Sequence, residues 1–228
     1  MMKRYQGSAG NVMTVADKVL VVDDHPIVLD GIELTMRNFF ASAEISTAIN
    51  GADTLAYIEK NPDVDWIMLD INLPDINGIE LLKAFRTRKL IANVIVLSSE
   101  CDPEVIDSAL KNKARGILSK SFDRNTIAEC IKTVEQGGVF LIPEHAMQLK
   151  NYRESVLKEK ILVEENISPR QQETLQLIAQ GYSNQEIASV MKVAESTVKS
   201  HVSSLMSLFE ADNRTHCVAE ARRLKILL

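Results

Sequence analysis

Short apolar runs alternate with helix-like stretches over the first two thirds of the chain. The runs are KVLVV (18–22), EISTAI (44–49), WIML (66–69), NVIVL (93–97) and RGIL (115–118). Apolar positions recur with helical spacing at about residues 26–40, 51–60, 77–88, 103–112 and 124–136. Strands that alternate with helices in this way pair in parallel and carry helices on both faces of their sheet. The pattern therefore predicts an α/β doubly wound domain with a five-stranded parallel sheet.

The last part of the chain, residues 166–228, contains no strand-like run and shows the pattern of four short helices. Ser168, followed by a proline, is a helix start signal, and Ser183 begins the capping box of a second helix. A longer helix is expected over 195–209. The apolar stripe expected in their core consists of Leu175, Ile178, Ile187, Val190 and Val198. Two helices joined by a tight turn predict a small all-α helix-turn-helix domain.

These patterns divide the chain into four segments. Residues 1–16 are expected to form a flexible N-terminal extension, residues 17–143 the α/β domain, and residues 166–228 the helix-turn-helix domain. Residues 144–165 are charged, lack glycine and proline, and have weak helical periodicity, so we expect a partly helical linker. The length of 228 residues suits two domains.

Composition sets the class of protein. The chain is 46% hydrophobic and 25% charged, the balance of a protein that buries a core. No apolar run approaches the roughly 18 residues of a membrane span, and no apolar segment follows the basic start, so we expect a cytoplasmic protein without membrane contact. Cys101, Cys130 and Cys217 lack metal-site spacing, and we interpret them as structural.

Polar side chains follow the ends of four predicted strands. Asp23 and Asp24 follow the first strand, Asp70 the third, Ser98 the fourth, and Lys120 lies just beyond the fifth. Open parallel sheets place their ligand sites beyond the carboxyl ends of the strands. We therefore expect these five side chains to share one rim of the sheet.

Crowded carboxylates repel one another unless a cation joins them. Mg²⁺ prefers one or two carboxylates with water and phosphate oxygens. We expect Asp24 and Asp70 to bind it, with Asp23 behind them and the backbone carbonyl of Asn72 as a further ligand. Beside Mg²⁺ a carboxylate can attack phosphorus and form an aspartyl phosphate, while the rim lysine and serine stabilise the phosphoryl oxygens.

The segments VLVVDDHP, MLDINLPDINGIELL, VLSS and ILSK, in this order and spacing, resemble the receiver domain of two-component response regulators. The resemblance covers roughly residues 17–140 and implies a flavodoxin-like fold. It implies that Asp70 is the phosphoacceptor and that Asp23, Asp24 and Asn72 bind Mg²⁺. It also implies that Ser98 and Lys120 hold the phosphoryl group.

Two positions depart from the receiver pattern. Ile117 stands where receivers often carry a Tyr or Phe that turns inward on phosphorylation, and Ser121 replaces the usual proline after the lysine. The sequence therefore leaves open how the phosphorylation state is transmitted from the receiver to the rest of the protein. His25, beside Pro26, is interpreted as a capping or packing residue rather than an acid or base.

Residues 168–225 resemble the LuxR-type helix-turn-helix of NarL/FixJ response regulators through SPRQQETLQLIAQGYSNQEIA, STVKSHVSSL and NRT. The resemblance implies that the helix around TVKSH enters the major groove of DNA. The side chains implied to face DNA are Thr197, Lys199, Ser200 and Ser203. Lys192 and Arg214 are placed to flank the DNA backbone, whereas Arg222 and Arg223 are interpreted as solvated surface. Ala194 stands where a capping serine is common.

The charge of the C-terminal segment bears on how it would bind DNA. Residues 166–228 hold seven Lys or Arg and six Asp or Glu, a balance of only +1. We therefore expect modest affinity as a monomer, which a homodimer would raise.

The leading hypothesis is a response regulator transcription factor. A partner histidine kinase would phosphorylate Asp70 and thereby control homodimerisation and binding of promoter DNA, with no enzymatic activity beyond slow self-phosphorylation and dephosphorylation. A phosphate-independent receiver with constitutive DNA or protein binding is the alternative, supported by Ile117 and Ser121. A phosphatase of the haloacid-dehalogenase type is less favoured, because Asn72 leaves no second carboxylate as general acid.

Overall fold

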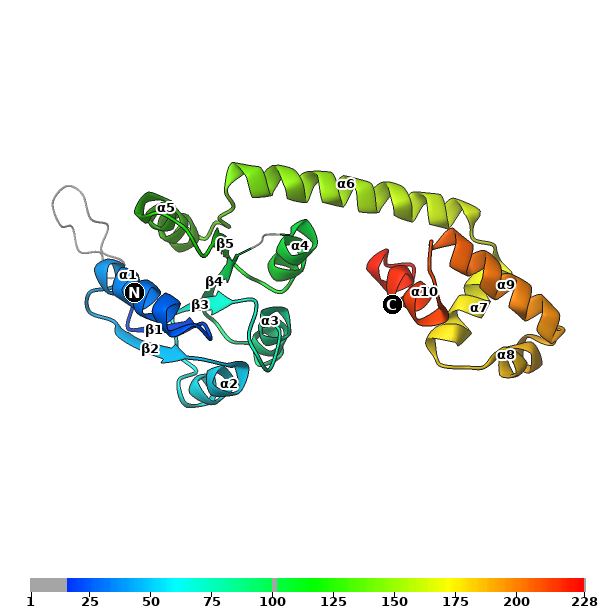
Figure 1. The fold of residues 1–228 in the computed structure, drawn as a ribbon, viewed down its shortest axis with the longest axis horizontal. Coiled ribbons are helices and arrows are strands. Elements are labelled where there is room, and N and C mark those ends of the chain that lie inside the picture. Colours follow the sequence, from blue (N-terminus) through cyan, green and yellow to red (C-terminus); the bar gives the residue numbers. More distant parts are fainter. Residues whose placement is uncertain (1–15, 100–101, 228) are drawn as a thin grey trace. The chain divides into compact units, whose positions relative to one another are not determined.

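The computed structural model describes residues 16–99 and 102–227. The chain divides into two compact units, Met1–Leu149 and Lys150–Leu228 (Figure 1). The division falls within the segment predicted as a linker. The predictions for the extension over residues 1–15 and for Cys101 lie outside the described residues.

The first unit is built on a parallel sheet with the strand order β2-β1-β3-β4-β5. Its strands are β1 (Lys18–Val22), β2 (Glu44–Ala48), β3 (Trp66–Asp70), β4 (Asn93–Ser98) and β5 (Gly116–Ser119). The helices between and after them are α1 (Pro26–Phe39), α2 (Gly51–Lys60), α3 (Gly78–Thr87), α4 (Pro103–Lys111) and α5 (Arg124–Glu135). The predicted doubly wound five-stranded fold is confirmed.

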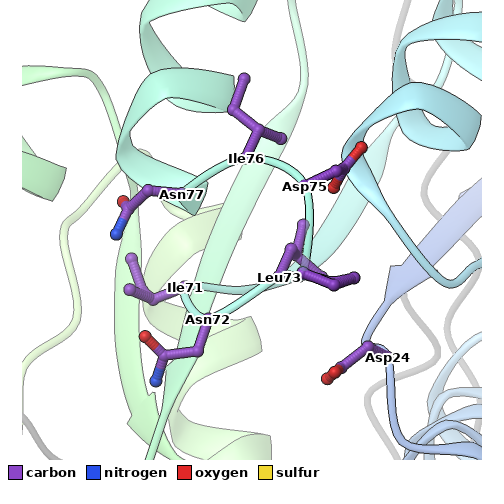
Figure 2. A pocket seen from close by; sticks show the side chains of 8 residues that line it. Asp24, Ile71, Asn72, Leu73, Asp75, Ile76 and Asn77 are labelled. Atoms are coloured by element: carbon purple, nitrogen blue, oxygen red, sulfur yellow. The ribbon is translucent and has the colours of Figure 1, made fainter.

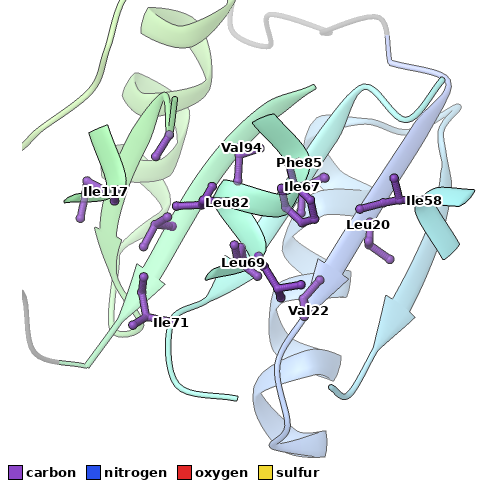
Figure 3. Close-up of a cluster of buried hydrophobic side chains, with 14 of the residues drawn as sticks. Leu20, Val22, Ile58, Ile67, Leu69, Ile71, Leu82, Phe85, Val94 and Ile117 are labelled. Atoms are coloured by element: carbon purple, nitrogen blue, oxygen red, sulfur yellow. The ribbon is translucent and has the colours of Figure 1, made fainter. Parts of the chain in front are cut away.

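Successive residues of each central strand point to opposite faces of the sheet, and each face has its own hydrophobic core. Val19 and Val21 of β1 pack in the core under α1 and α5, whereas Leu20 and Val22 pack in the core under α2, α3 and α4. Figure 3 shows the second of these cores, with Leu69 and other side chains of the central strands meeting side chains of the covering helices. Burial on both faces explains why the strands read as continuous apolar runs.

Two details concern the ends of the α/β domain, and the first of them differs from the boundary expected from sequence. Ala16, placed in the flexible extension, is buried in the core under α1 and α5, because the chain enters β1 beneath that helix layer. Phe140 pairs with Gly116 beside β5, and its carbonyl accepts a hydrogen bond from the Ile117 N–H at 3.2 Å. The segment that leaves the first unit therefore runs along the edge of β5.

The second unit is helical. α6 (Pro143–Asn166) begins in the first unit, and α7 (Pro169–Ala179), α8 (Asn184–Met191), α9 (Glu195–Leu208) and α10 (Arg214–Arg223) follow. The linker was predicted to be only partly helical, whereas α6 is one continuous helix. Its Leu149 belongs to the core under α2, α3 and α4, and its Val163 packs in the core of the second unit. None of the helices in the described residues is long and apolar enough to span a membrane.

The core of the second unit contains most of the predicted stripe. Leu175, Ile178, Ile187 and Val198 are buried. The prediction for Val190 was wrong, because its side chain is 53% exposed. The short helix α8 directs Ile187, Ala188 and Met191 inward, which leaves Val190 on its outer side.

Candidate functional site

The carboxyl ends of three strands bring the predicted rim residues together. Asp23 follows β1, Asp70 is the last residue of β3, and Lys120 follows β5. Lys120 Nζ lies 2.7 Å from Asp23 Oδ2 and donates a hydrogen bond of 2.8 Å to Asp70 Oδ2. Both aspartates are fully buried. Ser98 ends the intervening strand β4 and is also buried, so the strand ends of the sheet converge as predicted.

Burial and charge have opposite effects on the ionisation of these groups. Burial raises the pKa of Asp70, and the hydrogen bonds from Lys120 and from the Asn72 N–H offset this only in part. Burial acts to lower the pKa of Lys120, but its ion pair with Asp23 and its hydrogen bond with Asp70 outweigh burial and raise the pKa. The lysine is therefore held as a cation between the two carboxylates.

Asp24 and His25 complete an acidic group at this rim. One ligand atom each from Asp23, Asp24, His25 and Asp70 lies within 4.8 Å of the others. His25 Nδ1 is 2.7 Å from Asp24 Oδ1 and 3.2 Å from Asp23 Oδ1. The expectation that His25 caps or packs needs correction: it is the N-cap residue of α1, but its side chain makes no capping hydrogen bond and lies against the two carboxylates.

The oxygen atoms of this group suit a hard divalent cation. Within the described residues, Asp23 Oδ2 and Asp24 Oδ1 are buried and accept no hydrogen bond of good geometry, although Lys120 and His25 lie close. Carboxylate oxygens in such a position are the ligands that Mg²⁺ prefers. Asp24 also lines a cavity of about 440 Å³ with Asn72 and the rest of the loop after β3 (Figure 2). Room for a ligand therefore lies next to the acidic group.

The loop between β3 and α3, residues 71–77, is held at both ends and at its tip. The Asn72 N–H donates to Asp70 Oδ1 at 3.0 Å, and the Gly78 N–H donates to the Ile71 carbonyl at 2.8 Å. At the tip, Asp75 accepts hydrogen bonds from two backbone N–H groups of α2. Sequence reasoning identified the turn but missed Asp75, since the chain alone does not show which helix the loop approaches.

The structure also shows the surroundings of the two residues that depart from the receiver pattern. Ile117 in β5 is only 2% exposed and packs in the core under α2, α3 and α4. Ser121 follows Lys120, and its hydroxyl lies 2.8 Å from that of Ser119. The position of the usual inward-turning aromatic residue is thus filled by a buried aliphatic side chain.

In the second unit, the side chains predicted to meet DNA lie on the surface of α9. Thr197, Lys199, Ser200 and Ser203 are all exposed. Lys199 Nζ lies 2.9 Å from Glu195 Oε1 one turn earlier. Ala194 is the N-cap residue and gives no side-chain hydrogen bond, as its sequence position suggested. The outer face of α9 is therefore polar and accessible.

The basic residues around this helix have different surroundings. Lys192 is exposed at the end of α8, where its φ of 56° lies in the left-handed region. Arg214 donates to the Tyr182 carbonyl and, at 3.3 Å, to Asn184 Oδ1, so it ties α10 to the start of α8. The interpretation of Arg223 as solvated was wrong, because its guanidinium is half-buried and pairs with Glu159 at 2.5 Å and with Glu220 at 2.7 Å.

Family models match both units. The response regulator receiver domain matches residues 19–132, and the luxR family of bacterial regulatory proteins matches residues 165–221. The chain is 30% identical to the transcriptional regulatory protein DegU of Brevibacillus brevis over 219 residues, which are 90% of this chain and 92% of DegU. It is 32% identical to the transcriptional regulatory protein LnrK of Bacillus subtilis (strain 168) over 206 residues, 87% of this chain and 93% of LnrK.

A solved structure shares the fold. RcsB from Salmonella enterica serovar Typhimurium, bound to a promoter in the presence of a phosphomimetic, aligns with a TM-score of 0.53 at 21% identity, covering 91% of this chain and 99% of RcsB. The family models, the similar proteins, the fold and the strand-end site all indicate the same protein family. The chain belongs to the response regulators of the NarL/FixJ class, transcription factors that combine a receiver domain with a LuxR-type helix-turn-helix.

Proposed function

We propose that Asp70 accepts a phosphoryl group from a partner sensor histidine kinase in the cytoplasm and that this event controls homodimerisation and promoter binding. The observation that carries the proposal is the placement of Lys120 between the buried carboxylates of Asp23 and Asp70. A cation bound to two buried carboxylates at a strand end is suited to hold a third anionic group.

In the transfer, an oxygen of Asp70 forms a bond to phosphorus while the bond from phosphorus to the histidine nitrogen of the kinase breaks. Lys120 then compensates the charge of the phosphoryl oxygens, and the Ser98 hydroxyl donates to one of them. Asp23, Asp24, Asp70 and the carbonyl of Asn72 would hold Mg²⁺, which neutralises negative charge as the phosphoryl group arrives. Asn72 offers no carboxylate as general acid, which favours a phosphoacceptor over a phosphatase.

The exposed face of α9 would enter the major groove. Lys199, Ser200 and Ser203 would reach base edges, and Thr197 would contact them or a phosphate. Lys192 would bind the DNA backbone and set the position of the helix without reading sequence. Arg214 is predicted to flank the backbone as well, while its contacts with Tyr182 and Asn184 hold the turn before α8.

One observation favours a second candidate function, a receiver whose state does not govern DNA binding. Ile117 is fully packed and has no aromatic ring to turn inward on phosphorylation. The two functions differ in how promoter binding responds to an aspartyl-phosphate mimic.

Promoter binding of wild type and Asp70→Ala should be compared by footprinting, with and without beryllium fluoride and Mg²⁺. The first proposal predicts that the mimic strengthens binding of the wild type alone. Equal binding by both proteins, with no response to the mimic, would favour the second candidate and contradict the first.

A further inference from the structure

The tip of the β3–α3 loop is attached to a neighbouring helix by one carboxylate. Asp75 Oδ1 accepts the Gly51 N–H at 2.8 Å, and Asp75 Oδ2 accepts the Ala52 N–H at 2.9 Å. Gly51 and Ala52 are the first two residues of α2. Figure 2 shows Asp75 pointing out of the loop, away from Asn72. The loop thus satisfies backbone donors that α2 cannot satisfy within itself.

The helix has a separate cap of its own. Asn50 is the N-cap residue of α2, and its side-chain oxygen accepts the Asp53 N–H at 2.7 Å. Asp75 is therefore not the only capping group of α2. Its two hydrogen bonds join the loop to residues of α2 that lie 24 and 23 positions earlier in the sequence.

A second contact lies at the same place. Gly51 is buried, and a Cβ atom added there would lie 2.0 Å from Ile76 Cγ2 and 3.3 Å from Asp75 Oδ1. The loop tip can approach α2 this closely only because residue 51 has no side chain. Asp75 and Ile76 on the loop and Gly51 on the helix together form the contact, which we call the α2 anchor.

The anchored loop carries groups of the phosphoacceptor site. It begins at Ile71, directly after Asp70, and includes Asn72, whose carbonyl is proposed to bind Mg²⁺. Residues 71–77 form most of the cavity that Asp24 lines from the other side. The base of the loop is closed by the pairing of Asn72 with Asn77, and the α2 anchor holds its tip.

We propose that Asp75 is a positioning residue of the phosphoacceptor site, which fixes the loop on α2 and thereby holds the Asn72 carbonyl in place for Mg²⁺. This inference rests on the proposed function of the acidic site. Removing a group that is hydrogen-bonded directly to a metal ligand typically weakens metal binding by about 10–100-fold. Asp75 acts through the loop and not on Asn72 directly, so we expect an effect at the lower end of this range. The proposal assigns a positioning role to Asp75, which is not among the residues that would hold the ion or the phosphoryl group.

The test is calorimetric titration of the full chain with magnesium chloride. Asp75→Ala removes the carboxylate, and Gly51→Ala breaks the α2 anchor from the helix side. Asn50→Ala is the matched control, because it removes a capping hydrogen bond of the same helix and leaves the loop contacts intact. Circular dichroism of each variant establishes that it is folded. Labelling by acetyl phosphate, measured at low and at saturating Mg²⁺, gives a second readout.

We expect Asp75→Ala and Gly51→Ala to raise the Kd for Mg²⁺ about tenfold. Their labelling should be slow at low Mg²⁺ and recover at saturating Mg²⁺, while Asn50→Ala keeps the wild-type Kd. Wild-type affinity in both anchor variants would overturn the inference, and so would an equal loss of affinity in Asn50→Ala. Mg²⁺ binding by the wild type without labelling of Asp70 would refute the proposed function alone, because the comparison of Kd values would still decide the role of Asp75.

Discussion

At Gly78 the chain passes so close to β3 that a side chain does not fit. A Cβ atom there would lie 2.7 Å from the Asp70 carbonyl oxygen and 2.8 Å from Ile71 Cα, both of them backbone atoms. Backbone atoms cannot move aside as the end of a flexible side chain can. The missing side chain at Gly78 therefore lets α3 begin directly against the residue proposed to accept phosphate.

Gly78→Ala is expected to destabilise the first unit by about 1–3 kcal/mol, because the methyl group displaces the backbone around Asp70. Gly31→Ala is the control: apart from its chain neighbours and its own helix backbone, no described residue has an atom within 4 Å of a Cβ at this exposed position in α1, and the change should stabilise the helix by about 0.5–1 kcal/mol. Urea denaturation of both variants and the wild type measures the difference. A stable Gly78→Ala protein would show that the close approach is not needed.

Single residues differed in how well the sequence predicted them. Asp23, Asp70 and Lys120 could be placed together because parallel strands end at the same edge of a sheet. The contacts of His25 and Asp75 could not, since they depend on the path of loops between elements. The surroundings of Arg223 were predicted wrongly because its partner Glu159 lies on a helix 64 residues earlier in the chain.

At the scale of elements, helix ends followed their capping signals. Ser183 and Glu186 form the predicted capping box at the start of α8, with the Ser183 N–H and hydroxyl both donating to Glu186 Oε2 at 2.7 Å. α6 shows the opposite case. Its weak apolar periodicity predicted only partial helix, whereas the helix is continuous, with Leu149 and Val163 packing in different cores. Tertiary packing of a few positions outweighs a weak pattern.

The capping box gives a pH dependence. Hydrogen bonds from the Ser183 hydroxyl and backbone lower the pKa of Glu186. A lowered pKa in the folded state stabilises the fold above the unfolded pKa, and this contribution is lost as the pH falls through the folded pKa. Thermal unfolding above and below the usual glutamate pKa of 4.5 should show a smaller loss on acidification in Glu186→Gln than in wild type. The same loss in both proteins would contradict this role.

The packing of α6 gives a second prediction at this scale. Val163 is 1% exposed in the core of the second unit, so Val163→Ala should cost about 2 kcal/mol of stability. Its neighbour Leu162 is 58% exposed, and Leu162→Ala should change stability by less than about 0.5 kcal/mol. Denaturant unfolding of both variants compares the two positions. Equal effects would show that α6 does not belong to that core.

At the scale of the whole molecule, each unit has its own core and its own polar surface. The residues of the proposed phosphoacceptor site all lie in the first unit, and the exposed face of α9 belongs to the second. The fold of both units could be predicted because the apolar periodicity, and the alternation of strands with helices in the first unit, are read directly from the chain. How the proposed phosphorylation would affect the second unit could not be predicted, since Ile117 stands where the aromatic residue from which such a relay is usually inferred would be.

The most direct test of the account is the intact mass of the protein after incubation with acetyl phosphate and Mg²⁺. Wild type is expected to gain one phosphoryl mass, and Asp70→Asn is expected to gain none, because the amide cannot attack phosphorus. Omitting Mg²⁺ should abolish the gain in the wild type. Equal labelling of Asp70→Asn would contradict the assignment of Asp70 as the phosphoacceptor.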